Sequence, residues 1–195
     1  MSDTAAGDES ASETVHLATI DWQRGKWAGA KGKYSREHLW HLEGGAKLKA
    51  SDSPAMLPKA FADRAAVNPE NMFVAAVSSA HMLSWLNLAF GMGIEVTSYL
   101  DRAHGVLSET APGEFWVSEV ILHPRITFEP HYEVTTEAIA HLHELAHARC
   151  FIARSIKARG AVHAVNWATC SEVDRGPLRP MAETLKRRAG TGGEV

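Results

Sequence analysis

One stretch of the chain, Met72 to Ile94, runs for 23 residues without Asp, Glu, Lys or Arg. A helix of this length and composition is long enough to cross a bilayer. The stretch carries Ser78, Ser79 and His81, however, and no basic cluster flanks it as membrane segments usually require. A helix that is apolar on nearly every side is also typical of the centre of a soluble core. We therefore expect a core helix rather than a membrane span, and a second subunit that helps to cover it.

The residues before this stretch predict where the helix begins. Asn68 is a favourable N-cap, Pro69 suits the first helical position, and the carboxylate of Glu70 complements the positive end of the helix dipole. Gly91 predicts that the helix ends at about Phe90. These capping signals are independent of the apolar pattern, so both lines of argument support the same helix.

Apolar and β-branched residues alternate with turn signals through much of the remaining chain. We predict strands over residues 15–22, 37–42, 47–50, 94–107, 115–128 and 161–169, with turns at Gly44-Gly45 and Pro112-Gly113. Thr135 or Thr136 predicts the cap of a second helix that lasts to about Lys157, before Gly160. The order βββ-α-ββ-α-β is that of an α+β domain, because strands and helices do not alternate strictly.

Length and composition favour a single soluble domain. Of the 195 residues, 45% are hydrophobic, which is enough for one packed core. We place the domain at residues 15–170, after a leader over 1–14 that is expected to be disordered, and before a polar tail over 171–195 with a short helix at 181–188. The net charge of −3 and the scattered basic residues give no sign of nucleic-acid binding. Two cysteines and the lack of a secretory signal favour a cytoplasmic location.

The second predicted helix ends in the most specific motif of the chain. Residues 146–155 read Ala-His-Ala-Arg-Cys-Phe-Ile-Ala-Arg-Ser, with Cys150 at the centre. Together with Asn68-Pro69-Glu70 and the order of elements, this motif resembles the OsmC/Ohr family of organic hydroperoxide reductases. The resemblance covers most of residues 15–168. It implies an intertwined homodimer in which antiparallel sheets wrap around two long central helices, with the active sites at the interface.

The resemblance also implies a chemistry. Members reduce organic hydroperoxides with two cysteines, one on each central helix, and are recycled by a dithiol reductant, so no metal or organic cofactor is expected. The first cysteine attacks the peroxide as a thiolate, and the second traps the resulting sulfenic acid as a disulfide. Cys150 matches the second cysteine. Ala80, in the run Ser78-Ser79-Ala80-His81, stands where the family has the first.

Alanine cannot attack a peroxide, and the neighbouring hydroxyl does not replace the thiol, since Ser79 lies about 100° away around the helix. The chain is therefore either a working enzyme that carries a Cys-to-Ala substitution, or a natural homologue that has lost peroxidase chemistry and kept a pocket for a small apolar or electrophilic ligand. The sequence does not decide between the two. Cys150 by itself either forms a sulfenic acid or mixed disulfide, or lies inert in the core.

A glutamate at the start of the first helix is the other site residue that the resemblance implies. Glu70 matches the family glutamate that holds an arginine near the reactive sulfur. It is equally well explained as a first-turn acid that complements the helix dipole. The arginine of the family comes from the preceding loop, and Arg64 is nearby, but the resemblance does not extend to that position.

A rival motif lies in the second predicted helix. Residues 143–147 read His-Glu-Leu-Ala-His, which is the H-E-x-x-H pattern of zinc hydrolases, in which two imidazoles bind the metal and the glutamate is the base. The third ligand would have to be His163 or Glu172. The first lies on a predicted core strand and the second near the tail, so the hydrolase is the least favoured of the three functions.

A second metal hypothesis uses the same helix. His143, His147 and Cys150 fall within about 60° of one another along one helix edge, and two imidazoles with a thiolate suit zinc or copper. A stripe of polar residues at the solvent edge is the simpler interpretation, and His81 is most simply a hydrogen-bonded core residue. We therefore expect no bound metal.

Overall fold

The computed structural model describes residues 13–24, 34–53, 63–129, 131, 134–162 and 166–169, with side chains as far as residue 160. Its strands are β1 (Ala18–Asp21), β2 (His38–Leu42), β3 (Lys47–Ala50), β4 (Val96–Asp101), β5 (His104–Ala111), β6 (Glu114–Leu122), β7 (Pro124–Phe128), β8 (Arg159–Val162) and β9 (Asn166–Thr169). Its helices are α1 (Pro69–Gly91), α2 (Thr136–Arg149) and α3 (Phe151–Arg154). The predicted α+β class is confirmed. Most of the predicted leader, the polar tail and the helix at 181–188 lie outside the described residues.

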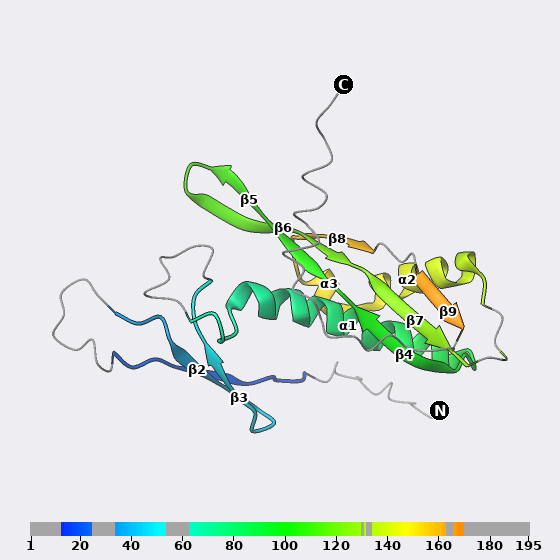
Figure 1. Cartoon of the computed structure of the whole chain (residues 1–195), viewed down its shortest axis with the longest axis horizontal. Helices are drawn as coiled ribbons and strands as arrows, with labels where there is room; N and C mark the ends of the chain where they lie inside the picture. The colour runs from blue at the N-terminus through cyan, green and yellow to red at the C-terminus, as the bar shows by residue number, and fades with distance from the viewer. Residues whose placement is uncertain are drawn as a thin grey trace, which may run out of the picture.

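The strands form three sheets in the orders β1-β2-β3, β4-β7-β9 and β5-β6-β8. The pairs among β1 to β7 are antiparallel, as expected. β8 and β9 follow α2 and α3 and join β6 and β7 in parallel, because a helical crossover lets the next strand run in the same direction. The single strand predicted over residues 161–169 is thus two strands, and Gly160, predicted to break a helix, lies inside β8. Figure 1 shows α1 alongside the second and third sheets, while β2 and β3 lie beyond its first turn.

The start of α1 follows its sequence signals closely. The side chain of Asn68 accepts a hydrogen bond from the amide of Asn71 at 2.8 Å, and Pro69 is the first helical residue. The predicted N-cap is therefore confirmed, and the predicted end at Phe90 differs by one residue from the observed end at Gly91.

Two predicted strands are each divided in the structure. The strand predicted over 94–107 becomes β4 and β5, and the one over 115–128 becomes β6 and β7. Asp101 ties the two breaks together, since its carboxylate accepts hydrogen bonds from the hydroxyl of Ser78 and from the amide of His123, the latter at 2.7 Å. No Gly or Pro follows Asp101 directly, so the first break had no turn signal. A long-range carboxylate contact accompanies it instead.

The second predicted helix, expected to run to Lys157, also divides. α2 ends just before Cys150, whose backbone is extended (φ −71°, ψ 109°), and α3 follows at once. The amide of Cys150 still donates to the carbonyl of Ala146 at 2.9 Å, so this residue closes α2 before the chain turns. The turn brings Ile152 of α3 against the apolar cluster around Val77. Packing of α3, rather than a helix-breaking residue, therefore explains the break.

Two apolar clusters hold the helices against the sheets. The smaller one joins Val77 of α1 to Val120 and Leu122 of β6. The larger one joins α1, β7 and α2 through Trp85, Leu88, Ala89, Ile126, Phe128, Ile139, Leu142 and Ala146. Trp85 is fully buried, and its ring centroid lies 6.3 Å from that of Phe128. Because α1 contributes to both clusters, it is a core helix.

One side of α1 stays outside both clusters. Leu83 and Phe90 are 60% and 54% exposed, and Met92 just beyond the helix is 58% exposed. Among the described residues, α1 is the one helix long and apolar enough to cross a membrane, and 28% of its most apolar stretch is buried. Side-chain hydrogen bonds from Ser78 to β4 and from His81 to α2 attach it to its own domain. Its own chain thus leaves much of α1 uncovered.

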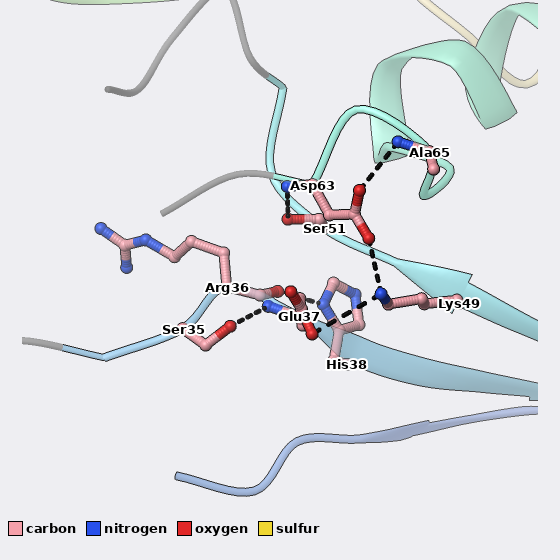
Figure 2. Close-up of polar contacts among 8 residues, drawn as sticks. All are labelled: Ser35, Arg36, Glu37, His38, Lys49, Ser51, Asp63 and Ala65. Carbon is pink, nitrogen blue, oxygen red and sulfur yellow. Dashed lines mark hydrogen bonds and ion pairs between the residues drawn. The ribbon is translucent and has the colours of Figure 1, made fainter. Parts of the chain in front are cut away.

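The N-terminal sheet is fastened to the segment that enters α1. The ammonium of Lys49 on β3 contacts the carboxylate of Asp63, which also accepts a hydrogen bond from the amide of Ala65 at 2.9 Å (Figure 2). The amide of Asp63 donates to the hydroxyl of the buried Ser51 at 3.2 Å, and backbone hydrogen bonds join Ser51 and Lys49 to Val67. These contacts fix the chain just before the N-cap, and with it the first turn of α1.

Candidate functional site

The two positions that match the family cysteines lie on helices that pack against one another. Ala80 is half-buried in the middle of α1, directly before the buried His81. Cys150 is a free thiol, 0% exposed, at the junction of α2 and α3, both of which contact α1. Of the two alternatives left open for Cys150, the structure shows the burial that an inert core position requires. Its reactivity stays open, because burial by itself describes packing and not chemistry.

Glu70 lies apart from these two positions. It is in the first turn of α1, ten residues before Ala80, and a rise of 1.5 Å per residue separates the two by roughly 15 Å along the helix. The Oε2 atom of Glu70 is buried without a hydrogen-bond partner, and no ion pair joins Glu70 to an arginine in the part of the chain that the structure describes. A single chain therefore does not bring the three candidate residues Glu70, Ala80 and Cys150 together.

An arginine that the sequence reasoning missed lies near the start of α1. The guanidinium of Arg36 stacks on the ring of Tyr34 at 3.9 Å from its centroid, and its Nε atom is buried without a hydrogen-bond partner. Arg64, which lies in the expected loop, is exposed. The sequence contained a signal for this group of side chains. Tyr34, Arg36 and His38 are every second residue, and every second residue of an extended chain lies on the same face.

These three side chains line a cavity of about 460 Å³ between the N-terminal sheet and the start of α1. The rest of the lining is Ile20, Trp22, Ser51, Asp52 and Pro69. Trp22 meets Tyr34 edge to face at 5.9 Å, and its indole N–H donates to the carbonyl of Ser35 at 2.8 Å. The cavity is therefore largely apolar, and the guanidinium of Arg36 in its wall is held in place by the ring of Tyr34.

A pair of buried histidines lies at the contact between α1 and α2. His81 Nε2 and His143 Nδ1 are 3.0 Å apart and share a hydrogen bond, and the rings are nearly parallel at an angle of 7°. The prediction that His81 is a hydrogen-bonded core residue is confirmed. Burial lowers the pKa of both imidazoles from 6.5 to about 4, so both are neutral at neutral pH. The Nε2 atom of His143 is buried without a hydrogen-bond partner.

We expect this pair to make the protein sensitive to acid. Between about pH 6.5 and 4 the unfolded chain binds protons at these rings that the folded chain does not, so the free energy of unfolding falls as the pH falls. The lowering of the pKa from 6.5 to about 4 corresponds to roughly 3 kcal/mol in the free energy of unfolding for each imidazole. Urea unfolding at neutral pH and at about pH 4.5 measures the loss.

In the variant His143→Gln, one titrating ring is gone and the loss should be about half as large. Other groups contribute at low pH as well, among them Asp63, whose carboxyl pKa is lowered by its hydrogen bond from Lys49. If the variant loses as much stability in acid as the unmodified protein, those groups and not the histidine pair are responsible.

The H-E-x-x-H residues are directed to different surroundings. His143 is 4% exposed and bonded to His81, whereas His147 is exposed. Glu144 is also exposed, and its carboxylate lies 3.6 Å from the ring of His141. Of His143, His147 and Cys150, predicted to share one helix edge, His147 is exposed, and Cys150 lies just past the end of α2. The interpretation as a polar stripe at the solvent edge is wrong, because His143 and Cys150 are buried.

No group of three or more His, Cys, Asp and Glu side chains arranged to hold a metal ion occurs within the described ranges. His163 and Glu172, the proposed third ligands, lie outside these ranges. Our prediction is that protein purified without chelators carries no stoichiometric zinc by elemental analysis. Near one equivalent of zinc per chain, lost in His147→Ala together with activity on an ester or peptide, would instead support the hydrolase.

A long apolar helix packed on a shorter one that ends at a buried cysteine, both held against largely antiparallel sheets, defines the class of α+β proteins with two central helices. Within that class, the chain belongs to the OsmC-like family. The model of the family described as OsmC-like protein matches residues 62–165, which include Glu70, Ala80 and Cys150. No curated protein matches the sequence.

Solved structures agree with this assignment. An OsmC-like protein of unknown function from Vibrio cholerae is 36% identical, with a TM-score of 0.75, and the match covers 78% of this chain and 100% of that one. An organic hydroperoxide resistance protein from Elizabethkingia anophelis is 18% identical with a TM-score of 0.58, covering 84% and 100%. The organic hydroperoxide resistance protein OhrB of Bacillus subtilis is 15% identical with a TM-score of 0.54, covering 80% and 98%. The last two share the fold.

Proposed function

We propose that this protein is an OsmC-type redox protein whose fold serves the thiol-dependent reduction of organic hydroperoxides, and that the reaction is interrupted at Ala80. Family membership and the hydroperoxide resistance proteins among the structural neighbours support a redox role of the peroxidase type. The observation that carries the finer proposal is that Cys150 is retained, buried beside the helix on which a methyl group occupies position 80.

The chemistry explains why position 80 decides the activity. A thiolate there would attack the outer oxygen of the peroxide, forming an S–O bond and breaking the O–O bond, while the leaving alkoxide takes a proton. The sulfur is oxidised by two electrons to a sulfenic acid, and the peroxide is reduced to an alcohol. The thiol of Cys150 would then form a disulfide and release water, and a dithiol reductant would restore both thiols. A methyl group permits none of these steps.

We propose that the working unit is a homodimer in the cytoplasm. A twofold axis perpendicular to α1 would make the two α1 helices antiparallel, and such an axis near Ala75, midway between positions 70 and 80, would set the partner subunit's Glu70 beside Ala80. Ala75 is exposed and lines a groove of about 620 Å³ along α1 together with Ser78 and Ser79. The small side chains there allow a second helix to approach closely. In this arrangement the cavity beside Arg36 also lies toward the neighbouring subunit's position 80.

The test is to restore the thiol. Ala80→Cys should reduce cumene hydroperoxide with a dithiol as the electron donor, and the unmodified chain should not. A second candidate function is a non-catalytic homologue that binds a small apolar or electrophilic ligand. The cavity of about 460 Å³ beside the start of α1 favours it, because aromatic and aliphatic walls around Arg36 suit an apolar molecule with an acidic group.

A further inference from the structure

Three histidines from α1 and α2 are arranged in space one after another, from the surface to the interior. His147 is exposed on α2, and it lines a small enclosed cavity of about 10 Å³ together with His81. That volume is close to the least that holds a water molecule. The other walls are almost entirely apolar, so the two imidazoles are the side chains to which a water there would bind. Beyond His81, the hydrogen bond of 3.0 Å leads to His143.

We propose that His147, a water molecule in this cavity, His81 and His143 form a proton-transfer chain that runs from solvent into the contact between α1 and α2. Neutral imidazole suits such a chain, because one ring nitrogen donates a hydrogen bond while the other accepts one, and the two roles exchange as a proton passes. The lowered pKa of His81 and His143 keeps both rings in this neutral form.

The position of the outer histidine is fixed by its neighbour. A Cβ atom built on Gly160 would lie 2.9 Å from Cε1 of His147, so the ring rests directly on the glycine. The charged and titratable groups whose fields reach His81 are Asp101 and His147, and His143 faces His81. Within the described residues, the chain reaches solvent at His147 and has a buried inner end at His143 Nε2.

The role of the chain rests on the proposed function. When a thiolate attacks a peroxide, the alkoxide leaving group takes up one proton, and the later formation of a disulfide releases the sulfenic oxygen as water. The backbone of His81 directly follows position 80 while its ring points to α2, so the chain would exchange protons between solvent and the helix contact next to the site rather than with the sulfur itself. The histidines act through other groups, and they are positioning residues rather than groups that touch the peroxide.

Proton exchange in the unmodified protein tests the chain without any peroxide. The probe is the proton shared by His81 and His143, followed by NMR in protein with 15N-labelled histidine. We expect its exchange with solvent to slow by at least about tenfold in His147→Gln, since an amide keeps hydrogen-bonding capacity but cannot relay a proton. Gly160→Ala, which displaces the ring of His147, should slow it too. His141→Gln, on the same helix with a side chain 67% exposed, is the matched control and should change nothing.

Free imidazole added to His147→Ala should restore fast exchange. Exchange that is equally fast in the unmodified protein and in both His147→Gln and Gly160→Ala would overturn the proposal, because opening of the fold would then carry the proton. A second arm measures sulfenic acid formation in Ala80→Cys with and without His147→Gln. An inactive Ala80→Cys would refute the proposed function but leave the exchange result standing, whereas a rate that His147→Gln does not lower would refute the role of the chain in the reaction.

Discussion

Placing a thiol at position 80 should convert the chain into an active hydroperoxide reductase. We expect Ala80→Cys to consume cumene hydroperoxide with dithiothreitol at least roughly a thousandfold faster than the unmodified protein, because loss of a covalent nucleophile costs enzymes this much or more. The physical reason is that only a thiolate attacks the O–O bond efficiently, and Ala80 presents a methyl group. Peroxide consumption in the steady state, measured with and without the reductant, is the direct assay.

Three companion variants sharpen the result. Cys170→Ser, made in every protein, leaves positions 80 and 150 as the thiol positions. Ala80→Ser places a hydroxyl at position 80 and should remain inactive. Ala80→Cys with Cys150→Ser should react once and stop as a sulfenic acid, which dimedone traps and mass spectrometry detects.

Steady turnover by the unmodified chain would refute the mechanism. A folded but inactive Ala80→Cys would favour the ligand-binding alternative, for which the cavity lined by Arg36 and its aromatic neighbours is the place to look.

We expect dissociation of the dimer into single chains to affect the protein as strongly as loss of the thiol does. We expect the protein to sediment in detergent-free buffer at about twice its chain mass of 21.2 kDa at low micromolar concentration. The reason is that Leu83 and Phe90 are more than half exposed on one chain, together with Met92 and Phe151. A monomer would leave this apolar surface in water, and patches of that kind mark protein contacts.

Charges on α1 test which surface is responsible. Leu83→Arg combined with Phe90→Arg should give monomers or aggregates, since neither arginine can be buried against an apolar surface of the second subunit without a partner charge. The matched control, Leu83→Met with Phe90→Leu, keeps the surface apolar and should remain dimeric. A folded monomer of the unmodified chain would remove the reason for completing the site with a second subunit. A protein that stays in solution only with detergent would indicate a membrane partner for α1 instead.

Some features of the fold were predictable because their causes are local. Asn68 and Pro69 begin α1 through contacts within one turn, so the sequence predicts the first helix almost to the residue. The turn at Pro112-Gly113 is equally local, and Gly113 takes a φ of 83°. In contrast, the break at Cys150 has neither Gly nor Pro beside it. It depends on how α3 packs against α1 and the apolar cluster around Val77, and no local pattern reports that.

The candidate site shows the same division. The resemblance identified Ala80, Cys150 and Glu70, but it did not show that Glu70 lies roughly 15 Å from Ala80 along the helix axis. Arg36 was missed because its significance comes from the cavity it lines, not from a motif. The H-E-x-x-H pattern was literal in the sequence, yet tertiary packing turned His143 inward and left Glu144 in solvent.

By itself, the sequence determined the α+β class, the position of the core helix, the family and the alanine at position 80, because capping, periodicity and residue identity are all recorded along the chain. The tertiary structure alone decided which side chains meet. His81 and His143 are 62 residues apart in the chain, and Ser78 and Asp101 are 23 apart. Such contacts form because helices and strands bury their apolar faces together, and the polar groups carried into the contact must then find partners there.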